Sequence, residues 1–310
     1  MGRSTGMIMG GNRQAPWRRV LLLASLLPAL PVQAFDWRDV GIDGDLTVTV
    51  DDNQSRAERT RDQVEDTSAS ARLAASYTPQ TGHNSMVLLS LFAEGEQFQE
   101  VDKLNRLSFG GKAAWRWQPH SGFLAPLVEW NVSAQDHNIR TDQRDSTEIN
   151  SQLFVTRRIT DRLTLSLGGE YRLFDARSEV FDLEDVRGFF NIDYLFGKGN
   201  ALYLTYSYLD GEVFSSAQRQ FCNGAFATDI LSLINASSAI EGDDAYNSTF
   251  CGDWVAYRLD ATTQTVQGGL NVPLGKSASF DLSVLHADVR GAGNNDYQRN
   301  LIRATVLKRF

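Results

Sequence analysis

The stretch LTLSLGGEYRL, residues 163–173, alternates apolar and polar side chains along its length. Leu163, Leu165 and Leu167 share one face of an extended chain, whereas Ser166 lies on the other. A period of two residues is typical of a β-strand, because successive side chains point to opposite faces. One apolar face and one polar face indicate that the two sides of the sheet meet different environments.

The same alternation recurs in twelve segments of the chain, and turn signals separate each segment from the next. The connections alternate between tight turns rich in Gly, Pro, Asn or Asp and longer, more charged links. A soluble β-sandwich also alternates, but segments of this length exceed the usual soluble strand of about 5–6 residues, which favours a barrel. The predicted strands are 44–54, 66–78, 85–97, 104–118, 124–137, 145–158, 163–176, 184–196, 201–214, 258–272, 277–291 and 296–310.

The first 34 residues are typical of a secretory signal peptide. Arg18 and Arg19 precede an apolar run, 20–30, which is too short to span a bilayer as a helix, and Ala34 ends a small-residue cleavage site. The mature chain is therefore expected to begin at Phe35. The predicted organisation is a signal peptide at 1–34, a periplasmic lead-in at 35–43, and a barrel at 44–310 with a long extracellular loop at 215–257.

The leader, the strand spacing and the terminal Phe310 resemble the bacterial outer-membrane β-barrel superfamily, without pointing to a subfamily. The resemblance covers about residues 44–310 and implies an all-β, membrane-spanning, antiparallel up-and-down barrel of about 12 strands in the bacterial outer membrane. It also implies outer-membrane lipids and lipopolysaccharide as partners, and a barrel-assembly machinery that reads the last strand, with Phe310 as its signal. Ile302 and Val306 fit the expected alternation of that strand, whereas Lys308 departs from it.

Charge and cysteine content narrow the possible partners. Four of the 30 basic residues lie in the leader, which has no acid, so the mature chain has 26 basic and 38 acidic residues and a net charge of −12. This balance argues against nucleic acid as a partner. Cys222 and Cys251 predict a disulfide, because an exported chain with an even number of cysteines normally pairs them. The segment between them has no His, and we expect no metal and no cofactor.

Taking the apolar face as outward places a polar set of both signs in the lumen. Desolvating these charges would cost several kcal/mol each unless they pair or stay hydrated, so the lumen is either a wet pore or a network of bracing ion pairs. Basic residues on neighbouring strands could favour anions or acidic sugars, unless nearby acids neutralise them. The predicted pore-lining residues are Lys112, Arg116, Glu129, Glu148, Arg158, Glu170, Arg172, Arg187, Asp193 and Asp281.

The long loop contains a possible amphipathic helix between its cysteines. Ala225–Ile240 can form a short helix with Thr228 as its N-cap and with Ile230 and Leu231 among its apolar residues. An apolar helix tied by a disulfide is not expected to extend freely into water. The hypothesis is that it folds over or into the barrel mouth and constricts it; the alternative is a local lid packed on the rim.

Catalysis has one weak candidate, His137, near the end of a predicted strand. Its sequence neighbour Asp136 falls on the opposite face, so the two side chains are not expected to form a simple catalytic dyad. The functions that stay open are a narrow channel for small hydrophilic solutes or ions, a structural or adhesive barrel with a plugged lumen and partner-binding loops, and an outer-rim lipid-modifying enzyme. The sequence names neither the solute nor the oligomeric state.

Overall fold

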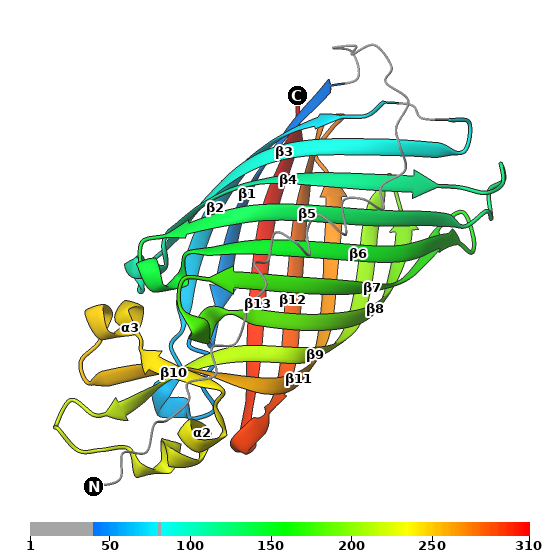
Figure 1. Cartoon of the computed structure of the whole chain (residues 1–310). Coiled ribbons are helices and arrows are strands. Elements are labelled where there is room, and N and C mark those ends of the chain that lie inside the picture. Colours follow the sequence, from blue (N-terminus) through cyan, green and yellow to red (C-terminus); the bar gives the residue numbers. More distant parts are fainter. Residues whose placement is uncertain (1–39, 80–81) are drawn as a thin grey trace, which may run out of the picture. The chain divides into compact units, whose positions relative to one another are not determined.

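The computed structural model describes residues 40–79 and 82–310. They form a closed antiparallel barrel of twelve strands in which β13 pairs with β1, and a short extra strand, β10, pairs with the end of β11 (Figure 1). The predicted fold class is confirmed. The signal peptide and most of the lead-in lie outside the described residues. The barrel strands are β1 (Val40–Asp51), β2 (Asp66–Tyr77), β3 (Ser85–Phe98), β4 (Arg106–Trp117), β5 (Leu127–Ile139), β6 (Ser146–Arg158), β7 (Leu163–Ala176), β8 (Leu183–Phe196), β9 (Asn200–Gln220), β11 (Asp253–Pro273), β12 (Ala278–Gly291) and β13 (Asn295–Arg309).

Two predicted boundaries differ from the structure. The first strand begins at Val40, inside the expected lead-in, and the long loop is shorter than 215–257 because β9 and β11 have 21 residues each. The ends of β9 and β11 pair with each other beyond the rest of the barrel. Alternation does not reveal this extension, because Ser215, Ser216 and Ala217 are all buried, so both faces of the hairpin are covered.

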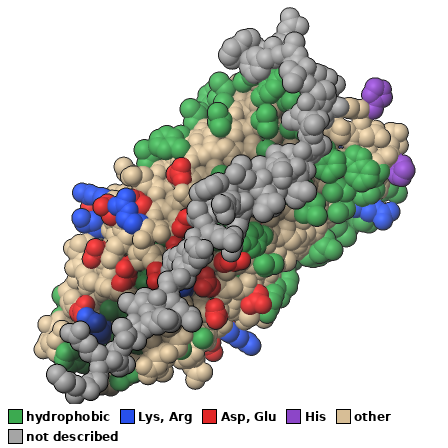
Figure 2. Space-filling model, in the orientation of Figure 1, with side chains coloured by type: hydrophobic (Ala, Val, Ile, Leu, Met, Phe, Trp, Pro, Cys, Tyr) green, Lys and Arg blue, Asp and Glu red, His purple; other side chains and the backbone are tan. Residues whose placement is uncertain are grey.

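The outer wall is apolar over most of its height. Leu46, Leu91 and Leu167 are 64%, 72% and 65% exposed, and each belongs to the alternation that points away from the lumen. An exposed apolar wall of this kind is expected to face lipid. Figure 2 shows hydrophobic side chains over much of the visible wall, with acidic side chains gathered on the part nearer the end that carries β10.

One rim has short turns, and the other has longer loops that contain short helical turns. We call these the short-turn rim and the long-loop rim. None of the helices in the described part of the chain is long and apolar enough to cross a membrane. The elements of the long-loop rim are η2 (Thr60–Asp62), η3 (Asp102–Leu104), η4 (Asp142–Arg144), η5 (Glu179–Phe181), η6 (Thr228–Ile230), α2 (Leu231–Ala236), β10 (Ala239–Gly242), α3 (Asp244–Thr249) and η7 (Ala292–Asn294).

Three rim loops share a design that fixes where their strands end. After a 3-10 turn, Asn105, Asp145 and Asp182 each accept a hydrogen bond from the backbone N–H of a residue that ends or nearly ends the preceding strand, at 2.6–2.8 Å. A side-chain oxygen thereby satisfies a strand donor that has lost its ladder partner. The loops between β3 and β4, β5 and β6, and β7 and β8 are therefore held close to the rim.

Candidate functional site: a polar lumen beneath a cap

The inward face of the barrel carries the polar residues that the alternation assigns to it. All ten predicted pore-lining residues lie on this face, opposite the exposed apolar residues of the same strands. Arg158 lies at the short-turn rim, where its guanidinium carbon is 5.4 Å from the centroid of the Phe123 ring. Whether these residues line a permeation path stays a prediction.

Most of the basic lumen residues are paired with acids on the adjacent strand. Arg116 pairs with Glu129, Arg187 pairs with Glu170, and the guanidinium of Arg172 donates from Nη2 to Asp185 at 2.8 Å. The acids in these pairs are nearly inaccessible, whereas the arginines are partly exposed to the lumen. These pairs neutralise most of the basic residues on neighbouring strands that, from the sequence, could favour anions.

Besides Arg158 at the short-turn rim, three predicted lumen charges have no ion pair within residues 40–79 and 82–310. Asp193 accepts a hydrogen bond from the amide of Asn191 at 2.6 Å, and Asp281 accepts one from the hydroxyl of Tyr203 at 2.9 Å. Lys112 makes no ion pair with a described acid. Charges without an ionic partner need water nearby, so the lumen wall supports a hydrated interior.

His137 lies between Ser108 and Glu148 rather than beside Asp136. Its Nδ1 is 2.8 Å from the Ser108 hydroxyl, and its Nε2 is 3.2 Å from a Glu148 carboxylate oxygen. A neutral imidazole can accept at Nδ1 and donate from Nε2, which joins three strands by hydrogen bonds. The serine is 2% exposed, which keeps solutes from its hydroxyl in this conformation. Catalysis at His137 stays a prediction.

The long-loop rim carries a compact unit that we call the cap, residues 213–259. It contains the paired ends of β9 and β11, the helices α2 and α3, and β10. Ile230 and Leu233 are 1% exposed and pack on Tyr257 and Val255 of β11. The chain between the cysteines therefore has a hydrophobic core of its own, which holds it against the β9–β11 hairpin.

The cap contacts rim loops from all round the barrel. The N–H of Ser216 donates to the carbonyl of Ser55 in the β1–β2 loop at 2.9 Å, and Trp254 packs in one cluster with Val101 and Leu104 of the β3–β4 loop. Ala256 packs on Val180 and Phe181 of the β7–β8 loop, and the hydroxyl of Tyr257 lies 3.3 Å from Asn295 Oδ1 at the start of β13. Because these loops lie around the rim, a single unit that touches all of them must lie across the mouth.

A buried ion pair joins the cap to the barrel. Arg144 of the β5–β6 loop donates to Asp243 of the cap at 2.7 Å, and Ser216 donates to the same carboxylate at 2.6 Å. Removing one partner of a buried pair leaves an uncompensated charge, so this contact fixes the cap in one position. Within the wall, Nε of Arg299 of β13 donates to both oxygens of Asp51 of β1 at 3.0 and 2.9 Å.

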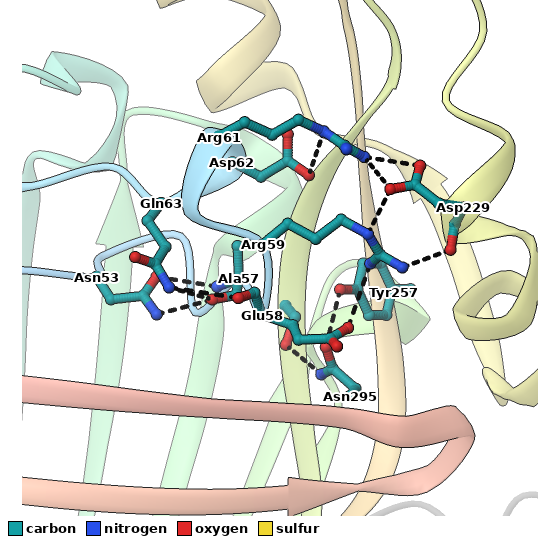
Figure 3. A network of polar contacts seen from close by, with 11 residues as sticks. Asn53, Ala57, Glu58, Arg59, Arg61, Asp62, Gln63, Asp229, Tyr257 and Asn295 are labelled. Carbon is teal, nitrogen blue, oxygen red and sulfur yellow. Dashed lines mark hydrogen bonds and ion pairs between the residues drawn. The ribbon is translucent and has the colours of Figure 1, made fainter.

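A second, more exposed contact ties the β1–β2 loop to the cap (Figure 3). Arg59 and Arg61 both donate to the carboxylate of Asp229, each at 2.7 Å. Burial opposes the charge of this carboxylate, but the hydrogen bonds and charges of the two guanidinium groups together outweigh it and hold the pKa of Asp229 below its usual value. The Asp62 carboxylate beside them is fully buried, and burial raises its pKa.

The predicted loop helix is shorter than expected and begins differently. Thr228 is the first residue of a 3-10 turn rather than an N-cap, and α2 has only six residues. Leu231, assigned to the apolar side, is 54% exposed, because the packed residues are Ile230 and Leu233. Cys222 and Cys251 form the predicted disulfide, with Cα atoms 5.3 Å apart, at the base of this insertion.

The sequence did not single out the residues that hold the mouth. Arg56, Arg144 and Asp243 lie in loops, where no periodicity marks a face, and Arg299 lies inside β13 but outside the predicted pore-lining set. The density of arginine in residues 56–61 is a signal that could have indicated an ionic contact with another loop.

Comparisons with known proteins identify the fold and nothing finer. No protein-family model matches the sequence, and no curated protein matches it. Among solved structures, the COG4313 outer membrane channel from Pseudomonas putida F1 is similar over 91% of this chain and 97% of its own, at 9% identity and a TM-score of 0.55. The KdgM porin in complex with disordered oligogalacturonate matches 86% of this chain and 98% of its own, at 14% identity and a TM-score of 0.42.

The first of these matches confirms the predicted fold: the chain is a β-barrel with the fold of an outer-membrane channel. This fold agrees with the predicted location in the bacterial outer membrane. At such low identity the comparison says nothing about the solute, and no subfamily follows from it.

Proposed function

We propose that the barrel is a narrow channel for small hydrophilic solutes or ions, with the cap limiting passage at the long-loop rim. The observation that supports this most is the lumen wall, where Lys112, Asp193 and Asp281 lack ionic partners among the described residues. A dry lumen would leave these charges desolvated at a cost of several kcal/mol each. A water-filled lumen removes that cost and provides a path for ions.

Single-channel recording in planar bilayers tests the proposal. The mature protein is expected to show a small, steady conductance. Ser133→Trp places a large ring on the inward face opposite Lys112, so it should reduce the conductance. Val132→Trp, one residue away on the outward face, is the matched control and should leave conductance unchanged. Equal conductance in both variants would contradict a path through the lumen.

The second candidate function is a structural or partner-binding barrel, and the cap favours it. A unit that touches rim loops around the whole mouth, with buried pairs such as Arg144–Asp243, resembles a permanent plug. This candidate predicts no steady conductance in the intact protein. Conductance that appears only after removal of the insertion between Cys222 and Cys251 would identify the cap as the plug.

A further inference from the structure

The guanidinium of Arg56 contacts the cap and has no acidic partner in the described part of the chain. Arg56 belongs to the β1–β2 loop and is partly buried, and its guanidinium carbon is 4.1 Å from the centroid of the Phe214 ring in the cap. No ion pair joins it to any acid in residues 40–79 and 82–310. A cation in such a place is stabilised by an aromatic face but stays uncompensated in charge.

Two more arginines crowd the same place, and their acids are already engaged. The guanidinium carbon of Arg144 is 5.1 Å from the same ring of Phe214. Arg144 is paired with Asp243. Arg299, whose charge repels that of Arg56, is paired with Asp51. Three cations therefore meet two anions, and the excess positive charge is that of Arg56.

One polar atom in this cluster lacks a partner, and the charge of Arg56 is disfavoured where it lies. Nε of Arg144 is buried and has no hydrogen-bond partner among the described residues. Burial, followed by repulsion from Arg299, lowers the pKa of Arg56 to about 10. Arg56 is still protonated at neutral pH, so the excess charge is permanent under physiological conditions.

The backbone at Arg56 also carries a cost. Its φ is 57°, in the left-handed region that L-residues other than Asn and Asp seldom adopt. An asparagine at this position would suit the backbone and would remove the uncompensated charge. If Arg56 served only the fold, replacing it by Asn would remove a ring contact while relieving two sources of strain.

We propose that Arg56, in the cluster it forms with Arg144 and Arg299, binds an oxyanion, a carboxylate or phosphate group. The anion would neutralise the excess charge and offer acceptors to the guanidinium of Arg56 and to Nε of Arg144. The inference rests on the proposed function, because the anion would reach Arg56 through the lumen. It also makes the proposed function more specific, since it names the solutes as small molecules that carry a carboxylate or phosphate group.

Calorimetric titration of inorganic phosphate into the detergent-solubilised mature protein tests this inference, with sodium chloride of equal ionic strength as the blank. The wild type should show saturable binding. Arg56→Asn should abolish it while keeping a thermal midpoint at least as high as the wild type in phosphate-free buffer. Arg219→Asn, which removes an exposed cap arginine paired with Asp253, is the matched control and should bind like the wild type. Arg56→Gln provides a second, near-isosteric test if the Asn variant fails to fold.

Absence of saturable binding in the wild type, or equal binding by the wild type and the Arg56 variants, would overturn the inference. Phosphate binding without any conductance would leave the inference standing and would contradict the proposed channel. Conductance without phosphate binding would do the reverse, so the two failures are distinguishable.

Discussion

The barrel wall and the cap are stabilised in different ways. In the wall, one pattern repeated along twelve strands places apolar residues such as Leu167 outward and polar ones such as Glu170 inward. In the cap, no pattern repeats, and individual contacts such as Arg144 with Asp243 decide the position. A single substitution in the wall therefore leaves many equivalent contacts in place. A single substitution in the cap can remove a contact that no other residue replaces.

The largest expected effect comes from Asp243→Ala. The change leaves Arg144 buried without its anion and also removes the acceptor of Ser216, so the cap should lose about 3–5 kcal/mol. Hydrogen exchange should show loss of protection in residues 221–252 while the wall strands keep theirs. Asp244→Ala, at the exposed neighbouring position, is the control. Simultaneous loss of protection in cap and wall would show that the two are one cooperative unit.

A substitution that introduces a charge on the outer face tests the barrel wall. Leu167→Arg places a guanidinium where the wall is expected to meet hydrocarbon, so folding into lipid should weaken by about 2–4 kcal/mol. Unfolding by denaturant in liposomes measures the change. Gln298→Arg, at an exposed position on the outward face of β13 near the long-loop rim, should cost little. Equal costs at the two positions would argue against an apolar band that ends below the long-loop rim.

Close packing inside the wall has a smaller effect. Gly168 leaves room for neighbouring rings, because a Cβ at this position would lie 2.4 Å from Cβ of Phe154 and 2.7 Å from Cζ of Phe189. Gly168→Ala is expected to destabilise the barrel by about 1–3 kcal/mol through overpacking. Gly188→Ala, where no atom lies within 4 Å of the added carbon, is the matched control in denaturant unfolding. A Gly168 variant as stable as the control would show that the rings move aside easily.

The smallest effect concerns the exposed contact between the β1–β2 loop and the cap. Because the pKa of Asp229 is depressed in the folded state, its contribution is present above the unfolded pKa and is lost as pH falls below about 4. The pair is exposed, so the loss should be under about 1 kcal/mol. Protease cleavage of the cap measured against pH should rise in this range for the wild type. Asp229→Asn should cleave at a nearly constant rate there, and an unchanged slope in that variant would assign the effect elsewhere.

The contrast between wall and cap also explains what the sequence could predict. The twelve strands, the inward residues such as Glu170 and Arg187, and the disulfide follow from a two-residue period and from cysteine number. The cap does not, because Ser55 and Ser216, or Arg144 and Asp243, are far apart in the chain and meet only after the barrel closes. His137 shows the same limit. Its partners come from neighbouring strands, and the alternation of apolar and polar residues does not determine the register in which those strands pair.

The measurement that tests the account most directly compares the conductance of the intact protein with that of a variant in which an Asn-Gly turn replaces residues 222–251. This variant keeps the twelve strands of the barrel and removes α2, β10, α3 and the disulfide. If the cap covers a water-filled lumen, single-channel conductance in the same bilayer should rise several-fold. Identical conductance in the two proteins, or none in either, would contradict the claim that the cap limits a path through the barrel.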